Sequence, residues 1–143
     1  MLRLLNVRRA IQNGLLGLAI VFVLVSGCGT PPECKIFGQV YVDEKPAEGV
    51  YVVFYAGGTT DTKTPASAAA RTDATGMFES RVLKPGTYVI TAFWPSVTIT
   101  EGEAIEGADQ FKGRYRNLHT PVMSYELGPG NNTLPQLKLS LQR

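Results

Sequence analysis

The chain has 143 residues, of which 14 are Lys or Arg and 12 are Asp or Glu, giving a formal net charge of +2. Residues 1–27 hold three of the basic residues and no acidic one, so residues 28–143 carry 11 basic and 12 acidic side chains and a formal charge of −1. This balance excludes a nucleic-acid partner recruited by charge alone, and the 116 residues of this region suit one domain rather than two.

The first 27 residues have the pattern of an export signal. Arg3, Arg8 and Arg9 precede an unbroken apolar run at residues 15–25, and no acidic residue occurs before Glu33. The run has 11 residues, whereas a helix needs about 20 to cross the hydrocarbon layer of a membrane. We therefore predict that residues 1–27 are a cleaved signal peptide with a short helical core, and not a permanent transmembrane span.

The end of this run, LVSGC at residues 24–28, resembles the lipobox of bacterial lipoproteins. In that family the cysteine sulfur receives a diacylglycerol, and the signal is then cleaved before the cysteine. The resemblance implies that Cys28 is the lipid attachment site, that residues 28–34 are a tether, and that the membrane is a partner through the lipid. The alternative is cleavage at another small residue, with Cys28 an incidental thiol.

An exported lipoprotein lies on the periplasmic or cell-surface face of a bacterial membrane. Gly29 stands where an aspartate would, by resemblance to the best-known sorting rule, retain the protein at the inner membrane, so the outer membrane is favoured. With Cys28 acylated, Cys34 is a lone thiol, and we expect no intramolecular disulfide. Cys34 is then a buried or linker cysteine, or it pairs with another chain or a small thiol.

The chain after the tether reads as short strands separated by turn residues. In CKIFGQVYVD, residues 34–43, apolar residues alternate with a period of two, which predicts a strand at 35–42. Pro46 and Gly49 interrupt the pattern and VYVVFYA at 50–56 resumes it, so we expect the two strands to form a hairpin. The residues expected to face the core are Val50, Val52 and Phe54, and those expected to face outward are Tyr51, Val53 and Tyr55.

The rest of the chain continues this pattern. Residues 57–66 are polar and rich in glycine, which predicts a surface loop. DATG at 73–76 and Pro85-Gly86 predict reversals, and residues 88–94, apolar on both alternating faces, predict a central strand. No stretch after residue 28 shows a helical stripe. We therefore predict an all-β fold, an antiparallel β-sandwich of about seven strands at residues 35–143.

Several motifs together resemble the carboxypeptidase regulatory-like family, whose fold is a transthyretin-like, immunoglobulin-like β-sandwich. They are GQVYVDEKPAEGVYVVFY at 38–55, TDATGMF at 72–78 and LKPGTY at 83–88, and the tail from FKGRY at 111–115 resembles the bacterial lipoprotein version of the family. The matching residues are Gly38, Pro46, Gly49, Thr72, Asp73, Gly76, Phe78, Leu83, Pro85, Gly86 and Tyr88. The resemblance covers roughly residues 35–141 and implies a fold without an activity.

Side chains suited to catalysis or metal binding are scarce. His119 is the only histidine, and one imidazole cannot be both a general base and its partner, so a transthyretin-like hydrolase is the least favoured hypothesis. The usual zinc-ligand motifs do not occur in the sequence. Glu101 to Asp109, within TEGEAIEGADQ, could bind a cation such as calcium, but the stretch follows no EF-hand register and is typical of a solvated loop. We expect no catalytic residue, no metal and no cofactor.

Tyr41, Tyr51 and Tyr55 are the candidate ligand-binding residues. On the expected hairpin they would form one outward aromatic face, joined by Val53, which could stack on sugars or receive a partner protein. The alternative is that this face packs under a long loop at 97–117. The sequence thus predicts a non-enzymatic, lipid-anchored envelope or cell-surface module. The alternative function is a carbohydrate- or protein-binding module, with an envelope polysaccharide or protein as its partner.

Overall fold

All the regular secondary structure of the described residues is β-strand. We describe the fold from a computed structural model, in which residues 29, 32–61 and 63–141 are described. In chain order the strands are β1 (Cys34–Val42), β2 (Lys45–Pro46), β3 (Tyr51–Ala56), β4 (Ala68–Arg71), β5 (Met77–Val82), β6 (Gly86–Phe93), β7 (Pro95–Thr100), β8 (Glu103–Asp109), β9 (Met123–Leu127), β10 (Gly130–Thr133) and β11 (Leu137–Leu139). The predicted all-β fold is confirmed. In this part of the chain, no helix is long and apolar enough to span a membrane.

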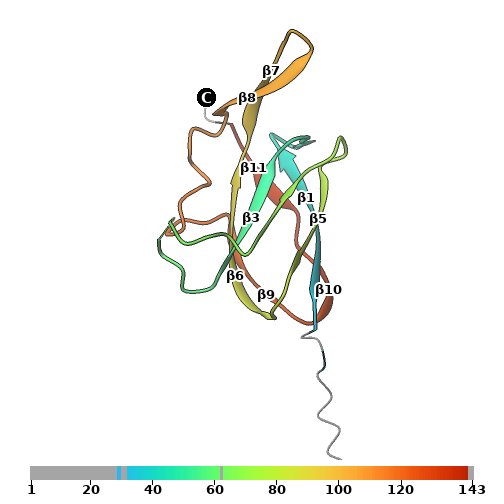
Figure 1. Cartoon of the computed structure of the whole chain (residues 1–143), viewed down its shortest axis with the longest axis vertical. Helices are drawn as coiled ribbons and strands as arrows, with labels where there is room; N and C mark the ends of the chain where they lie inside the picture. Colours follow the sequence, from blue (N-terminus) through green and yellow to red (C-terminus); the bar gives the residue numbers. More distant parts are fainter. Residues whose placement is uncertain (1–28, 30–31, 62, 142–143) are drawn as a thin grey trace, which may run out of the picture.

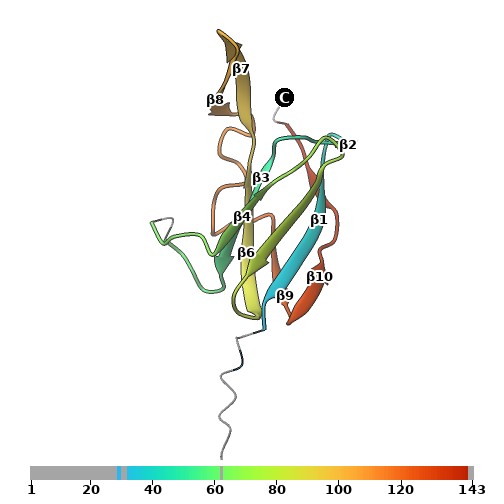
Figure 2. The same cartoon turned by 45° about the vertical axis from the view of Figure 1, so that its right-hand side comes forward.

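The strands form two main sheets that pack together as a sandwich (Figure 1, Figure 2). In the sheet around β1, the β1 sheet, strands β2 and β5 pair with β1 antiparallel, while β10 and β11 run parallel to it. In the other, the β6 sheet, the order is β4-β3-β6-β9 and every pairing is antiparallel. The parallel pairing of the first strand with the last two departs from the antiparallel expectation and joins the two ends of the domain.

The core lies between the inner faces of these two sheets. The alternation of β1 and β5 buries every second residue, as a period of two requires. On the β6 sheet, Val52, Phe54, Ile90 and Ala92 are fully buried, and Val50, just before β3, is buried with them. The predicted core face of residues 50–56 and the predicted central strand at 88–94 are therefore confirmed.

Two predicted turns have the expected chemistry. Asp73 Oδ1 accepts hydrogen bonds from the backbone N–H of Thr75 and of Met77, at 2.8 and 3.0 Å, and Gly76 has a φ of +74° that favours glycine. At the β5–β6 turn, the hydroxyl of Tyr88 donates a 2.7 Å bond to the carbonyl of Lys84. This bond holds the corner at the end of the sandwich where β1 begins.

The predicted hairpin between residues 35–42 and 50–56 is wrong. A two-residue turn at Asp43 and Glu44 instead joins β1 to the short β2, and the chain then crosses to β3 in the other sheet. The hydroxyl of Thr72 fixes this crossover, because it accepts a bond from Val50 N–H at 2.9 Å and donates one to the Ala47 carbonyl at 2.6 Å. In opposite sheets, the apolar faces of β1 and β3 bury each other, which neighbouring positions in one sheet would not allow.

The predicted long loop at 97–117 is also wrong in its first half. β7 and β8 form a separate two-stranded sheet, turned at Glu101 and Gly102, and the acidic stretch forms β8. Threonine and isoleucine alternate along β7, and these β-branched residues favour extended structure. The hairpin projects beyond the sandwich at the end opposite the first residue of β1 (Figure 1, Figure 2).

Candidate functional site

The three candidate tyrosines do not share one face. Tyr41 is on β1 in the β1 sheet, whereas Tyr51 and Tyr55 are on β3 in the β6 sheet. The predicted common face is therefore wrong for Tyr41, because β1 and β3 lie in opposite sheets. Tyr51 and Tyr55 do lie on the outward face of the β6 sheet with Val53, since the intervening residues of β3 point into the core. Their role in binding stays a prediction.

Tyr51 lies at the centre of a cluster that joins four strands, which we call the Tyr51 cluster. Its ring stacks on that of Phe93, with centroids 4.7 Å apart and planes at 5°. The guanidinium of Arg71 lies 5.7 Å from the Tyr51 ring centroid, and its Nη2 is 3.8 Å from Glu106 Oε1. The same Glu106 oxygen accepts a 2.8 Å bond from the Tyr51 hydroxyl. This bond to a carboxylate raises the pKa of Tyr51, with burial and the negative charge acting in the same direction.

Beside the Tyr51 cluster lies a cavity of about 250 Å³, which we call the Arg116 cavity. Val53, Tyr55, Thr91, Phe93 and Arg116 line it. The guanidinium of Arg116 lies 4.6 Å from the centroid of the Phe93 ring, at a distance typical of a cation–π contact. The cavity therefore combines an apolar wall, a phenol and a fixed positive charge.

The segment at 97–117 does contact the aromatic face, as the alternative interpretation expected. Glu106, on β8, binds the hydroxyl of Tyr51, and Arg116, from the loop after β8, lies over Phe93. Tyr51 and Tyr55 nevertheless stay half-buried and are not fully covered. The face is thus an aromatic surface with charged groups at its edge, and the alternative is correct only in part.

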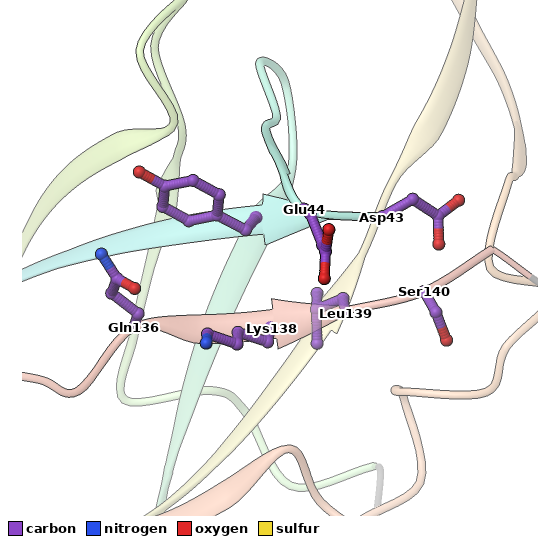
Figure 3. A pocket seen from close by; sticks show the side chains of 7 residues that line it. Asp43, Glu44, Gln136, Lys138, Leu139 and Ser140 are labelled. Atoms are coloured by element: carbon purple, nitrogen blue, oxygen red, sulfur yellow. The ribbon is translucent and has the colours of Figure 1, made fainter.

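Tyr41 lines a different and larger cavity, of about 530 Å³, at the ends of β1 and β11. The other lining residues are Asp43, Glu44, Gln136, Lys138, Leu139 and Ser140. Figure 3 shows Glu44 near Leu139 between the two strands, with Gln136 just before β11 and Lys138 on it. Asp43 and Glu44 have φ values of 47° and 66°, a left-handed backbone that favours glycine, so two carboxylates are held at this edge in an uncommon conformation.

The structure describes only one of the two cysteines. Cys28, the predicted lipid attachment site, lies outside the described residues. Cys34 is the first residue of β1, one position before the expected domain boundary, and it is fully buried in the core as a free thiol. Of the interpretations offered for Cys34, burial favours the structural one, because a thiol without exposed surface does not reach another chain.

The side chains considered for catalysis or metal binding lie apart from these cavities. His119 is exposed, and its backbone N–H donates to Asn117 Oδ1 at 2.8 Å. Among the described residues, no three His, Cys, Asp or Glu side chains gather closely enough to hold a metal ion. Along β8, Glu106 binds Tyr51, and Asp109 accepts bonds from the backbone N–H groups of Trp94 and Phe111 at 2.9 and 3.1 Å. These two carboxylates therefore have structural partners.

Sequence reasoning did not identify Phe93, Arg71 or Arg116 as members of the aromatic site. Residues 88–94 were expected to be apolar on both faces, and the pairing of Phe93 with Tyr51 follows only from the register between β3 and β6. Arg71 pairs with Tyr51 from the other neighbouring strand, β4. The alternation of residues 50–56 and 88–94 could have suggested that Tyr51 and Phe93 share a face. Arg116 comes from an irregular segment whose sequence has no periodic pattern.

The sequence matches no protein-family model and no curated protein. The resemblance to the carboxypeptidase regulatory-like family and to lipoproteins therefore stays a prediction. Among solved structures, the chain is similar to the minor pilin GBS52 of Streptococcus agalactiae, at 15% identity over 78% of this chain and 46% of that chain, with a TM-score of 0.44.

Two further solved structures are similar to this chain. One is a DUF3823 family protein from Parabacteroides merdae, at 17% identity over 77% of this chain and 46% of that chain, with a TM-score of 0.38. The other is the dioxygenase domain of a dioxygenase carbohydrate-binding protein fusion from Streptomyces sp. SirexAA-E, at 21% identity over 80% and 84% of the two chains, with a TM-score of 0.40. The chain spans less than half the length of the pilin and of the DUF3823 protein. At this level of similarity none of these proteins informs the function, and the sandwich assignment rests on the strand pairing.

Proposed function

We propose that the protein is an exported, lipid-anchored and non-enzymatic β-sandwich module of the cell envelope. The observation that carries this proposal is the position of β1 relative to the lipobox. The first residue of β1, Cys34, follows Cys28 by six residues, which extend over at most about 20 Å. Because β1 begins at the end opposite the β7–β8 hairpin (Figure 2), a lipid on Cys28 holds that end near the membrane and the hairpin away from it.

Localisation follows from the same residues. Cleavage before Cys28 leaves a mature chain with a formal charge of −1, so the lipid and not charge attaches it to the membrane. The proposal places the protein on the periplasmic or cell-surface face and, from Gly29, at the outer membrane. The proposal assigns no catalytic step. His119 is exposed, and the carboxylates of Glu106 and Asp109 on β8 accept hydrogen bonds from groups of the same domain.

Mass spectrometry of the mature N-terminus tests the anchor. We expect a mature chain that begins at a diacylglyceryl-modified Cys28, and a Cys28→Ser variant that leaves the membrane fraction. Cys34→Ala is the matched control, which keeps the lipid because it leaves the lipobox intact. An unmodified chain that begins elsewhere, or a Cys28→Ser variant that stays in the membrane, contradicts the anchor. Hydrolysis of an ester or amide that His119→Ala abolishes contradicts the non-enzymatic assignment.

A second candidate function, binding of an envelope polysaccharide or protein, is favoured by the Tyr51 cluster. Stacked aromatic rings with an adjacent guanidinium are a frequent feature of binding surfaces, because they bury apolar area and carry donors at the edge. Pull-down of the full-length protein with purified envelope polysaccharide or envelope protein tests it. Tyr55 lies on the same outward face and lines the cavity beside this cluster, so we expect Tyr55→Ala to abolish capture. Tyr41→Ala should leave it unchanged, since Tyr41 lies on the opposite sheet. Equal capture by Tyr55→Ala and the wild type excludes this face.

A further inference from the structure

We infer that the Arg116 cavity binds a sugar residue that bears a carboxylate, as in an acidic polysaccharide. In this arrangement the guanidinium of Arg116 binds the carboxylate, and the sugar ring lies on the outward face of the β6 sheet. The inference rests on the binding function proposed for the Tyr51 and Tyr55 face, and it names the chemical class of the ligand.

The base of the cavity is buried although it belongs to an outward face. Val53 and Thr91 are directly paired across β3 and β6, and both point away from the core. Their exposed fractions are nevertheless only 8% and 3%. The surrounding side chains, including Tyr55, Phe93 and Arg116, therefore stand above this pair and form the walls of a depression. A preformed depression of this kind lowers the entropic cost of binding, because few side chains have to be ordered.

Arg116 has a charge that the described residues do not neutralise. Arg71 lies within ion-pair distance of Glu106, and Arg81 lies 3.1 Å from a carboxylate oxygen of Glu33. Within residues 32–61 and 63–141, Arg116 has no carboxylate within 4.0 Å; its guanidinium rests on the ring of Phe93 instead. A guanidinium held in this way presents a planar pair of donors, which match the two oxygens of a carboxylate.

The other walls suit a sugar ring. Tyr55 is half-buried, and its hydroxyl has no hydrogen-bond partner among the described residues, so it is available to a ligand hydroxyl. The rings of Tyr55 and Phe93 offer apolar surface to the C–H groups of a sugar. The cavity volume of about 250 Å³ lies below the ~300 Å³ lower limit of pockets for larger ligands, so it fits one residue of a chain.

The larger Tyr41 cavity does not have this charge. Asp43 and Glu44 line it with a single basic residue, Lys138, so its formal charge is negative and it disfavours an anion. An acidic ligand is therefore directed to the Arg116 cavity on the β6 sheet. This difference makes the two cavities distinguishable by experiment.

Calorimetric titration of the full-length protein in detergent micelles tests the inference. The probes are a trimer of galacturonic acid and the same trimer with its carboxyl groups methyl-esterified. We expect the acidic trimer to bind, and esterification or Arg116→Gln to weaken binding at least about tenfold, because each removes a charge-assisted hydrogen bond. Arg116→Lys keeps the charge and loses the planar fork, so it retains part of the affinity. Arg81→Gln, on the other sheet, is the matched control and binds like the wild type.

The outcomes separate this inference from the functions on which it rests. Absence of binding by both trimers, equal binding of the two trimers, or full affinity in a folded Arg116→Gln variant overturns the acidic-sugar ligand. If the esterified trimer binds equally and Tyr55→Ala abolishes binding, the aromatic binding function stands and only the acidic ligand is excluded. Since the titration is made in detergent, failure of the lipid anchor does not change its result. Thermal unfolding of each variant confirms that it is folded.

Discussion

The hydroxyl of Tyr51 on β3 donates a 2.8 Å hydrogen bond to the carboxylate of Glu106 on β8, 55 residues further along the chain. This bond connects the projecting β7–β8 hairpin to the outward face of the sandwich. It is reinforced by Arg71, which lies over the Tyr51 ring and 3.8 Å from Glu106. The orientation of the hairpin therefore depends on the same tyrosine that stacks in the candidate binding face.

We predict that Glu106→Gln lowers the pKa of Tyr51 toward its ordinary value. The hydrogen bond to the Glu106 carboxylate is the main cause of the raised pKa, and the substitution removes the negative charge. Because the folded pKa lies above the unfolded value of 10.0, the stabilising contribution is complete below pH 10 and is lost as the pH rises through the folded pKa. The ring ζ-carbon shift of Tyr51, followed by NMR during a pH titration, measures this change.

Tyr88 is the internal control for this titration. Burial is the main cause of its raised pKa, and Glu106 is not among the causes, so its titration should be the same in the wild type and in Glu106→Gln. If Tyr51 titrates at the same pH in both proteins, the hydrogen bond to Glu106 does not set its pKa.

Gly38 on β1 allows Phe78 on β5 to fill the core. The two residues are paired on the inner face, and a Cβ added at Gly38 would overlap the ring of Phe78. We predict that Gly38→Ala destabilises the domain by about 1–3 kcal/mol, because the ring has to leave its position. Urea unfolding measures the difference. Gly128→Ala is the control, since the nearest atom to its added Cβ, Asn132 Oδ1, is 3.9 Å away, and equal stabilities of the two variants would contradict this packing.

The sequence predicted the fold class, because local patterns determine whether a segment forms a strand and which of its faces is buried. Val52, Phe54 and Ile90 are in the core as the alternation of their segments indicated. The same patterns do not determine the partner of a strand. Residues 35–42 and 50–56 therefore suggested a hairpin, although in a sandwich two consecutive strands often belong to different sheets.

The sequence predicted the candidate site only where side chains alternate between the two faces of one strand. Tyr51 and Tyr55 were expected on one outward face, and they share it. Glu106 was assigned to a solvated loop because acidic residues and glycines surround it, whereas β-branched residues on β7 supply its strand partner. The position of Arg116 over Phe93 depends on the path of an irregular segment between β8 and β9, for which the sequence has no periodic signal.

Tyr88→Phe should weaken the corner between β5 and β6. The substitution removes the hydroxyl that donates to the Lys84 carbonyl at 2.7 Å and leaves the buried ring in place. We expect a loss of about 1 kcal/mol in the free energy of unfolding, the usual contribution of one hydrogen bond. Tyr55→Phe is the matched control, because no partner of its hydroxyl is found in the described part of the chain. Equal urea midpoints for the wild type and Tyr88→Phe would show that the corner does not need this bond.

The turn at Asp73 makes part of the stability dependent on pH. The hydroxyl of Thr75 donates to Asp73 Oδ1 at 2.7 Å, and this bond is the main cause of a pKa below the ordinary value of 3.8, with the backbone N–H groups of Thr75 and Met77 acting in the same direction. Because the folded pKa is the lower one, the contribution is present above about pH 4 and is lost as the pH falls through the folded pKa.

We therefore predict that Asp73→Asn is less stable than the wild type at pH 7, and that the difference between them shrinks as the pH falls from 7 to 2, because the wild-type carboxyl becomes protonated over this range. Urea midpoints at the two pH values measure both differences. Thr75→Val, which removes the hydroxyl donor, should raise the pKa of Asp73 and reduce the pH dependence without abolishing it, since the two backbone donors remain. A difference between the wild type and Asp73→Asn that is as large at pH 2 as at pH 7 would assign the effect to the shape of the side chain and not to its charge.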